Sequence, residues 1–329
     1  MNVLITGGTG FIGSRLAMRC HGGGHRVRVF GQANTAAEES NVEELKTAGV
    51  EVVLESILNR TDIAEAVKGM DVVFHLAAAQ HEANVPDQVF RDVNVQGTKT
   101  LIEESIRAGV DRFVHGSTIG VYGSALGGVI DENSPCKPDN IYGVTKYEGE
   151  HVLRHYQDRI PICIIRISET YGPGDRRLLK LFKGVANGKF PHIGDGNNIH
   201  HLIFVEDLID GFLLAAQEDR AIGETFVLAG KEPLTTTEML KTVADVVGQK
   251  KPFLRLPMFP FMMAAVMMEL TLSPLGIQPP LHRRRMDFFK KSYLFSQEKS
   301  SVLLGFNSKT SFRDGAEATA LWYRQKALL

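Results

Sequence analysis

Short, nearly continuous apolar runs alternate with longer segments of helical period through the first two-thirds of the chain. Runs of this kind, such as residues 72–76, are typical of parallel strands that helices cover on both faces. The segments between them repeat apolar residues at helical spacing. This alternation predicts an α/β protein with a doubly wound parallel sheet. The expected strands lie within residues 3–5, 27–30, 49–56, 71–79, 112–123 and 161–175, and the expected helices within residues 14–20, 61–69, 94–109 and 142–157.

Beyond residue 173 the alternation becomes less regular, and we expect a second, smaller unit there. The predicted domains are residues 1–172 and residues 173–329, the second being a C-terminal α/β substrate lobe with some segments returning to the first domain. The lobe should close over the carboxyl edge of the sheet, where open α/β sheets bind ligands. Its expected elements are helices within 178–190, 205–219 and 235–248, a strand within 224–230, and a final amphipathic helix that ends near Trp322.

The most apolar stretch, residues 256–276, is rich in Met and Phe. Pro257, Pro260 and Pro274 leave too few uninterrupted apolar residues to cross a bilayer, and Glu269 lies among them. We expect a buried or cleft-covering helix, or an interfacial one. Ordinary core packing is favoured over a pliable apolar wall for a lipophilic substrate.

Glycines follow the first expected strand in "TGGTGFIG". A glycine turn between a parallel strand and a helix lets the backbone approach a pyrophosphate, which the N–H groups at the helix N-terminus then bind. Gly7 would form the tight turn, Gly10 the close approach, and Gly13 the packing of the helix against the strand. The strand before the turn and the helix after it are the context that this motif requires. The turn therefore predicts a dinucleotide site.

Composition excludes several other classes of function. The formal net charge is −1, so no global basic field would attract nucleic acid. Three widely spaced cysteines fit a reducing compartment better than a disulfide framework. His192, His200 and His201 lack the spacing of a metal site, and we expect no bound metal. The first strand pattern begins at residue 3, and we expect a soluble, cytoplasmic protein without stable membrane insertion.

Two residues in "DNIYGVTKYEGE", Tyr142 and Lys146, share one helix face because they are four apart. A phenol is a poor base at neutral pH, but an adjacent ammonium stabilises the phenolate and lowers its pKa. Ser117 and Thr118 end the strand within "HGSTIGVYG", where a hydroxyl can contact a substrate. This set of groups predicts proton abstraction from a secondary alcohol while a nicotinamide accepts the hydride.

The chain resembles an extended short-chain dehydrogenase/reductase of the NAD-dependent epimerase/dehydratase family. The matching stretches are "TGGTGFIG", "HLAAA", "DVNVQGT", "STIGVYG", the Tyr142–Lys146 pair, "ETYGPGD" and "HHLIFVEDL". The resemblance implies a Rossmann-type sheet and a homodimer through the helices at 94–108 and 142–157. It also implies that Tyr142 is the general base, that Lys146 holds the cofactor ribose and tunes Tyr142, and that Thr118 hydrogen-bonds the reacting oxygen. The cofactor-binding positions that it implies are Gly7, Thr9, Gly10, Phe11, Ile12, Gly13, Gln32, Ser56, Ile57, Leu76, Ala77, Ala78, Asn94, Ser117, Tyr142, Lys146 and Ile167.

Departures from the family pattern reduce the number of expected reaction types, but they do not decide between NAD and NADP as the cofactor. Ile119 and Gly120 occupy positions where the dehydratase and decarboxylase branches carry acids, so simple oxidation, reduction or epimerisation is favoured. Gly31 and Gln32 follow the second strand without the carboxylate that binds the ribose of NAD. The loop after them also lacks an arginine for the extra phosphate of NADP. We favour NAD slightly over NADP, although Arg15 or Arg28 could bind that phosphate.

The substrate is the least determined part of the site. His200 and Glu169 occupy positions where relatives that act on nucleotide sugars carry an arginine and an asparagine, and a carboxylate repels a diphosphate. Arg176 and Arg177, or the arginines at 283–285, would compensate. A sugar or sugar nucleotide is the leading substrate, a hydroxysteroid or β-hydroxy-ketone is the alternative, and a non-catalytic dinucleotide sensor is disfavoured because Tyr142 and Lys146 are both present. The candidate substrate contacts are Gln80, Thr118, Glu169, Arg177 and His200.

Overall fold

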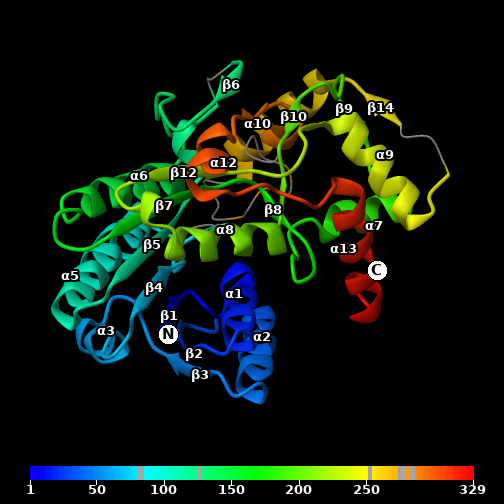
Figure 1. The fold of residues 1–329 in the computed structure, drawn as a ribbon. Helices are drawn as coiled ribbons and strands as arrows, with labels where there is room; N and C mark the ends of the chain where they lie inside the picture. Colours follow the sequence, from blue (N-terminus) through cyan, green and yellow to red (C-terminus); the bar gives the residue numbers. More distant parts are fainter. Residues whose placement is uncertain are drawn as a thin grey trace.

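The computed structural model describes residues 1–80, 85–124, 127–250, 254–272, 277, 279, 281 and 286–329. A sheet of seven parallel strands lies at the centre of the molecule, in the order β12-β7-β5-β4-β1-β2-β3 (Figure 1). The chain winds outward from β1 to one side through β2 and to the other through β4, so the predicted doubly wound α/β fold is confirmed. The strands are β1 (Asn2–Thr6), β2 (Arg26–Gly31), β3 (Glu51–Leu54), β4 (Val72–His75), β5 (Arg112–Thr118), β7 (Ile162–Ile167) and β12 (Thr225–Leu228).

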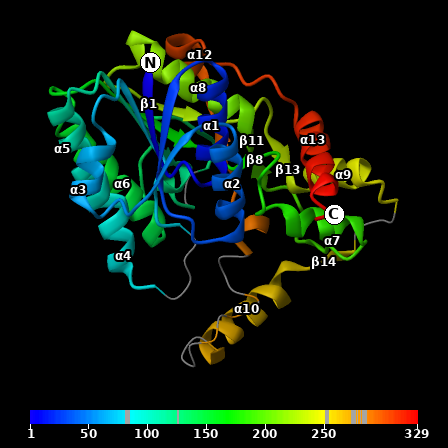
Figure 2. The ribbon, with the colours of Figure 1, turned by 90° about the horizontal axis from the view of Figure 1, so that it is seen from below.

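Helices cover both faces of this sheet because its strands present apolar side chains alternately to each side. Val3 and Ile5 pack on the face covered by α1, α2, α8 and α12, whereas Leu4 between them packs on the face covered by α3, α5 and α6. Figure 2 shows the two groups on opposite sides of the strands. These helices are α1 (Phe11–Gly22), α2 (Ala36–Thr47), α3 (Arg60–Ala66), α5 (Thr98–Ala108), α6 (Ile141–Arg154), α8 (Val205–Gln217) and α12 (Glu298–Leu304).

A separate apolar cluster holds the C-terminal lobe together beside the sheet. Phe182 of α7 (Leu179–Ala186), Val243 of α9 (Thr236–Val247) and Tyr323 of α13 (Phe312–Gln325) are buried in it. The domain boundary at residue 172 stays a prediction. Two short strand pairs join segments before and after residue 173: β8 (Thr170–Tyr171) with β11 (Ile203–Phe204), and β6 (Val129–Ile130) with β15 (Leu294–Phe295). Two more lie beyond residue 173: β9 (His192–Ile193) with β14 (Arg255–Leu256), and β10 (Ile199–His200) with β13 (Leu234–Thr235).

Side-chain caps explain where several helices begin. Asn140 accepts a hydrogen bond from the Gly143 N–H at 3.0 Å, which fixes the start of α6. Thr235 and Glu238 form a reciprocal capping box on α9. The helix expected within 94–109 instead begins as a π-helical turn, Asp92–Gly97, and continues as α5. The remaining short elements are α4 (Asp87–Arg91) and the 3-10 turns Ile119–Tyr122, Asp219–Ala221 and Asp287–Phe289.

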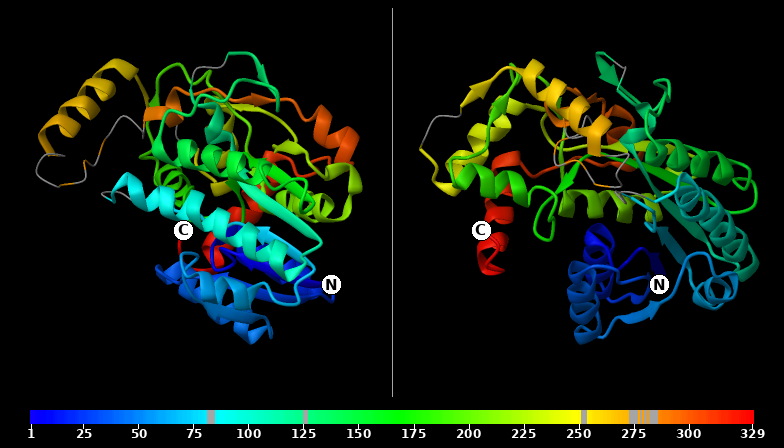
Figure 3. Two further views of the ribbon diagram at one scale, coloured as in Figure 1. Left: turned by 90° about the vertical axis from the view of Figure 1, so that its left-hand side faces the viewer. Right: turned by 180° about the vertical axis from the view of Figure 1, so that it is seen from behind.

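The Met-rich stretch forms α10 (Met258–Leu272), which projects from the body of the molecule (Figure 3, left). Of the alternatives expected for this helix, burial in the core is wrong, because Ala265 is its single buried residue, and an interfacial or cleft-covering helix stays a prediction. Phe259 is 74% exposed and Leu270 is 68% exposed. Within the described residues, no helix is long and apolar enough to cross a membrane.

Candidate active site

The glycine turn after β1 is shaped for close approach of another backbone or ligand. Gly7 has φ +69°, and a Cβ placed there would lie 2.5 Å from the Ala77 nitrogen. A Cβ on Gly13 would lie 2.3 Å from the Gly7 carbonyl oxygen. Gly10 caps α1 without a side chain, and the first turn of α1, which contains Phe11 and Ile12, carries no acidic residue. This uncovered helix N-terminus fits the phosphates of a dinucleotide.

Polar contacts fix the rim of this turn at the ends of β2 and β3. The Thr9 hydroxyl donates to the Gln32 carbonyl at 2.7 Å, and the Asn41 amide donates to the Thr9 carbonyl at 2.8 Å. Ser56 accepts a hydrogen bond from the Leu58 N–H at 3.2 Å. Ile57 is buried beside Gly97, which joins the rim to the π-helical turn.

The segment after β4, from Leu76 through Ala77 and Ala78, passes directly beside Gly7. Asn94 holds the next residue, Ala79, through both of its backbone groups. The same amide donates to Thr145 on α6 at 2.9 Å. Asn94 is 1% exposed and lies within the π-helical turn, a local geometry that is frequent at functional sites. It therefore joins the cofactor side of the site to the helix that carries Tyr142.

Thr118 and Ile167 are paired neighbours at the carboxyl ends of β5 and β7. Thr118 is half-buried, and its hydroxyl oxygen accepts a hydrogen bond from the Gly120 N–H at 3.1 Å. The hydroxyl of Ser117 instead donates to the buried carboxylate of Glu150 at 2.6 Å. Of the two hydroxyls at this strand end, that of Thr118 has the greater access to a ligand above the sheet.

Tyr142 and Lys146 approach this strand end on α6. A Cβ on Gly143 would lie 2.6 Å from the Gly120 carbonyl, so the absence of a side chain lets α6 pack closely against the turn after Thr118. Tyr142 is the second residue of α6 and is half-buried. The helix dipole favours negative charge at this position. Lys146, one turn later, is 1% exposed.

A buried pair of histidines lies beneath Lys146, and the sequence analysis missed it. The Lys146 ammonium lies 3.3 Å from His115 Nε2, and the ring centroids of His115 and His75 are 5.0 Å apart. Burial and the charge of Lys146 hold the pKa of each histidine well below its ordinary value, so both rings are neutral. The neutral His115 ring can accept a hydrogen bond from the Lys146 ammonium through Nε2. The two histidines pair on adjacent strands that end at the site, His75 as the last residue of β4, but neither carries a motif that marks it in the sequence.

Burial lowers the pKa of Lys146 from 10.5 to about 8, although Glu150 opposes the shift. This shift corresponds to a cost of roughly 3 kcal/mol for the buried ammonium at neutral pH. Because the folded state binds fewer protons than the unfolded state between pH 8 and 10.5, the free energy of unfolding should rise with pH across that window.

We expect Lys146→Met to be at least as stable as the wild type at pH 7 and to lack this rise. Urea unfolding of both proteins at pH 7, 9 and 10 measures the difference, and other titrating groups cancel in the comparison. Equal pH dependence of the two proteins would contradict the assignment of a buried ammonium at this position.

The structure brings together two of the predicted substrate contacts, Glu169 and His200. His200 Nδ1 lies 3.1 Å from a Glu169 carboxylate oxygen, and His200 Nε2 lies 2.9 Å from the Thr236 hydroxyl. Burial raises the pKa of Glu169, but the hydrogen bond and charge of His200 and the charge of Arg177 outweigh it, and the net pKa is lowered. Glu169 is therefore a carboxylate at neutral pH.

The other predicted substrate contacts lie at the edge of the site. The Arg177 guanidinium donates to the Thr170 carbonyl at 2.7 Å, next to Glu169 in the chain. Gln80 is exposed at the end of the segment after β4. The arginines at 283–285 lie outside the described residues.

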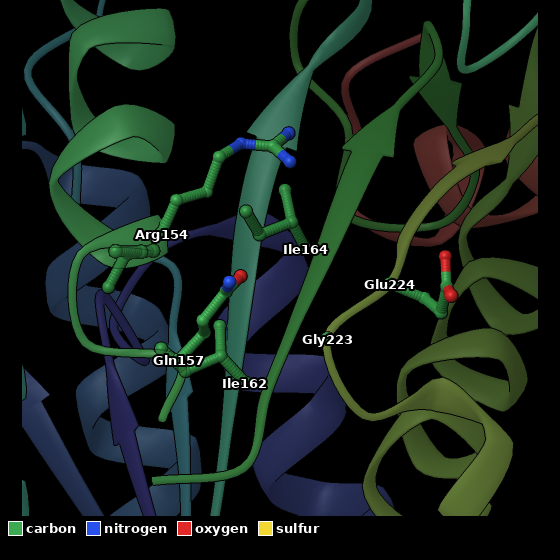
Figure 4. Close-up of a pocket in the computed structure, with 7 residues that line it drawn as sticks. Arg154, Gln157, Ile162, Ile164, Gly223 and Glu224 are labelled. Carbon is green, nitrogen blue, oxygen red and sulfur yellow. The ribbon is translucent and has the colours of Figure 1, made fainter. Parts of the chain in front are cut away.

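Within the described part of the chain, no group of His, Cys, Asp and Glu is arranged to hold a metal ion. His192 contacts Thr237 at 2.9 Å, and His201 contacts the Gly230 carbonyl at 2.9 Å. A small pocket lies between the C-terminal end of α6, the first half of β7 and the turn before β12 (Figure 4). Arg154, Ile162 and Gly223 are among the residues that line it, so it is separate from the candidate active site.

The doubly wound sheet, the glycine turn and the Tyr142–Lys146 helix define a dinucleotide-binding protein of the short-chain dehydrogenase/reductase type. Residues 3–229 match the profile of the NAD dependent epimerase/dehydratase family, and the chain belongs to this family. The resemblance drawn from the sequence motifs is thereby confirmed. Members of this family are NAD-dependent enzymes of the extended short-chain type.

Similar proteins of two substrate classes are known. UDP-glucuronic acid 4-epimerase from Bacillus cereus, solved in complex with NAD, has a TM-score of 0.82 and 26% identity, with 99% of each chain covered. The N-acetyl-alpha-D-glucosaminyl-diphospho-ditrans,octacis-undecaprenol 4-epimerase of Escherichia coli O157:H7 is 28% identical over 262 residues, which is 78% of this chain and 75% of that protein.

The 3beta-hydroxysteroid-dehydrogenase/decarboxylase isoform 2 of Arabidopsis thaliana is 29% identical over 297 residues. The match covers 84% of this chain and 52% of that protein, so the chain spans about half the length of this relative.

Proposed function

We propose that the protein catalyses NAD-dependent hydride transfer at a secondary alcohol carbon, with a sugar or sugar nucleotide as substrate and epimerisation as the net reaction. The observation that carries the proposal is the close packing of Gly143 on Gly120. This contact brings the first turn of α6, with Tyr142, to the strand end that carries Thr118, while Lys146 lies buried beneath. The glycine turn that fits a dinucleotide lies at the same sheet edge.

Each residue of this set has a separate chemical role. Tyr142 accepts the proton of the reacting hydroxyl group, and the Lys146 ammonium together with the α6 dipole stabilises its negative charge. Thr118 donates a hydrogen bond to the reacting oxygen. Asn94 positions the segment after β4 through Ala79. When bound, the nicotinamide of NAD accepts the hydride and can return it to the opposite face of the carbon.

NAD is the proposed cofactor in preference to NADP. The two arginines near the glycine turn that would bind the extra phosphate of NADP are already paired. Arg15 contacts the carboxylate of Glu206, and Arg28 contacts that of Glu51 at 2.7 Å. Binding a 2′-phosphate would require one of these pairs to break. Gly7 and Gly10 would let the backbone approach the pyrophosphate, Gly13 lets α1 pack closely on this turn, and Lys146 would bind the nicotinamide ribose.

One observation favours the alternative substrate class, a hydroxysteroid or another lipophilic alcohol. The Glu169 carboxylate, which stays ionised beside His200, would repel the diphosphate of a sugar nucleotide. A neutral alcohol meets no such repulsion, and its hydroxyl groups can donate to the carboxylate. By analogy with the family, we also propose a cytoplasmic homodimer that pairs through α5 and α6.

Denaturing freshly purified protein and identifying the released cofactor by absorbance and mass is the test of the proposed reaction. Stoichiometric NAD, followed by interconversion of UDP-sugar epimers without added cofactor, is the expected result. Formation of NADH from a 3β-hydroxysteroid, with no epimerisation of any UDP-sugar, would establish the alternative. Failure of the protein to bind NAD or NADP would overturn both.

A further inference from the structure

One face of α10 exposes a continuous apolar stripe to solvent. Phe259, Met263, Met267 and Leu270, here called the α10 stripe, are 74%, 49%, 56% and 68% exposed. Their spacing of four, four and three residues places them along a single helix face. The Thr271 hydroxyl, which follows the stripe, donates to the Met267 carbonyl at 2.8 Å and so offers little polarity of its own.

The opposite side of α10 accounts for its attachment to the lobe. Ala265 is buried with Ile193 of β9 and with Met286, and Phe261 and Met262 pack around them. The stripe therefore faces away from the apolar contacts that hold the helix in place. It lies on an element that projects from the molecule (Figure 3, left), and none of its four residues belongs to the candidate active site described above.

The size of the stripe argues against a second copy of this chain as its partner. A helix of 15 residues is about 22 Å long and about 10 Å wide, so the face that one copy offers is roughly 220 Å². A stable protein interface buries about 800 Å² on each partner. A bilayer needs no such complementary surface, because its interface takes up an apolar helix face directly.

The sequence that precedes and follows α10 is basic, as attraction to an anionic lipid surface requires. Residues 250–285 contain six basic residues, at 250, 251, 255 and 283–285, and one acidic residue, Glu269. Of those that the structure describes, Lys250 and Arg255 precede the helix and are exposed. Basic residues held near the bilayer surface are attracted to anionic headgroups, each by about 1 kcal/mol, and this attraction adds to the insertion of the apolar face.

We propose that α10 docks the protein on the surface of a membrane that contains anionic lipids, with the α10 stripe inserted at the level of the headgroups. The helix is too short to span the bilayer, so attachment is peripheral. Docking would place the candidate active site beside the membrane, where substrates carried by a lipid are presented. The inference does not depend on the proposed reaction, because its test measures attachment without substrate.

Flotation with vesicles of phosphatidylcholine and phosphatidylglycerol at 3:1, and with pure phosphatidylcholine, tests the proposal. The variant carries Phe259→Gln, Met263→Gln and Met267→Gln. The matched control carries Val302→Gln and Leu321→Gln, which replace side chains 61% and 55% exposed on α12 and α13. We expect the wild type and the control to float with the anionic vesicles. The triple variant should bind them about a hundredfold less, while its circular dichroism and Tm stay unchanged.

Arg255→Gln measures the electrostatic part of the docking. One basic residue near an anionic surface changes binding by about fivefold, so this variant should float less with the anionic vesicles and be unchanged on pure phosphatidylcholine. The proposal is overturned if the wild type floats with neither vesicle, or if the triple variant and the control float equally. It is also overturned if sedimentation without vesicles shows a dimer that the triple variant dissociates, because the stripe would then bind a second copy.

Discussion

Replacement of Tyr142 with phenylalanine should reduce turnover by about a thousandfold while leaving the fold and NAD binding intact. A positioned general base contributes about 10²- to 10⁴-fold to a rate, and removal of the phenol oxygen eliminates that contribution without changing the shape of the side chain. Initial rates at saturating substrate measure the loss, and the stoichiometry of bound NAD shows that the cofactor site persists.

Tyr147→Phe is the matched control for this variant. Tyr147 lies on the same helix but packs edge-on against His151, with ring centroids 4.4 Å apart. Its hydroxyl has no role in the proposed chemistry, so we expect turnover close to that of the wild type. A Tyr142→Phe enzyme as active as this control would eliminate Tyr142 as the base and require another residue at the carboxyl end of β5.

The second large effect concerns stability, at the buried ion pair below the site. The Arg166 guanidinium contacts both Glu150 carboxylate oxygens, at 2.8 and 3.1 Å, and donates to the Tyr122 hydroxyl at 2.9 Å. Glu150 is 0% exposed and also accepts from Ser117, the neighbour of Thr118. Arg166→Met would leave this carboxylate without its main partner, and we expect a loss of about 3 kcal/mol in the free energy of unfolding.

For a chain of this size such a loss lowers Tm by about 4 °C, which differential scanning calorimetry can measure. Addition of Glu150→Gln should recover part of the loss, because the stranded charge is then removed. The exposed pair of Arg313 and Asp245 provides the control, since Arg313→Met should change stability by less than about 1 kcal/mol. If Arg166→Met and Arg313→Met had equal effects, the network around Glu150 would not stabilise the fold.

Local patterns in the sequence were sufficient to predict the sheet and the glycine turn. A buried parallel strand and a glycine-rich helix start are each recognisable from a pattern of a few consecutive residues. The roles of Gly7 and Gly13 could therefore be predicted without knowledge of any tertiary contact. The cap of α2 was also local: Thr35 accepts from the Glu38 N–H, yet the polar composition of 36–47 concealed the helix.

Contacts between distant segments were beyond such reasoning. The approach of His115 to Lys146 depends on α6 packing against β5, and neither histidine carries a motif of its own. The failure at α10 has a different cause. Hydrophobic residues lie on all sides of this helix, and a helix of that composition is expected to be buried. The sequence does not show whether other elements are available to cover it. In this fold one side packs on the lobe and the other does not.

The position of β12 at the edge of the sheet has a consequence for the order in which the chain can fold. β12 pairs with β7, although 57 residues, 168–224, separate them in the sequence. α8 and α12, which cover the same sheet face as α1, come from still later or intervening segments. A nascent chain that has emerged only as far as Tyr142 and Lys146 therefore has the reactive groups, but it lacks β7, β12 and the part of one face's cover that α8 and α12 provide. During synthesis, part of this apolar sheet face therefore stays exposed to solvent, or is shielded by other proteins, until α12 and hence almost the whole chain has left the ribosome.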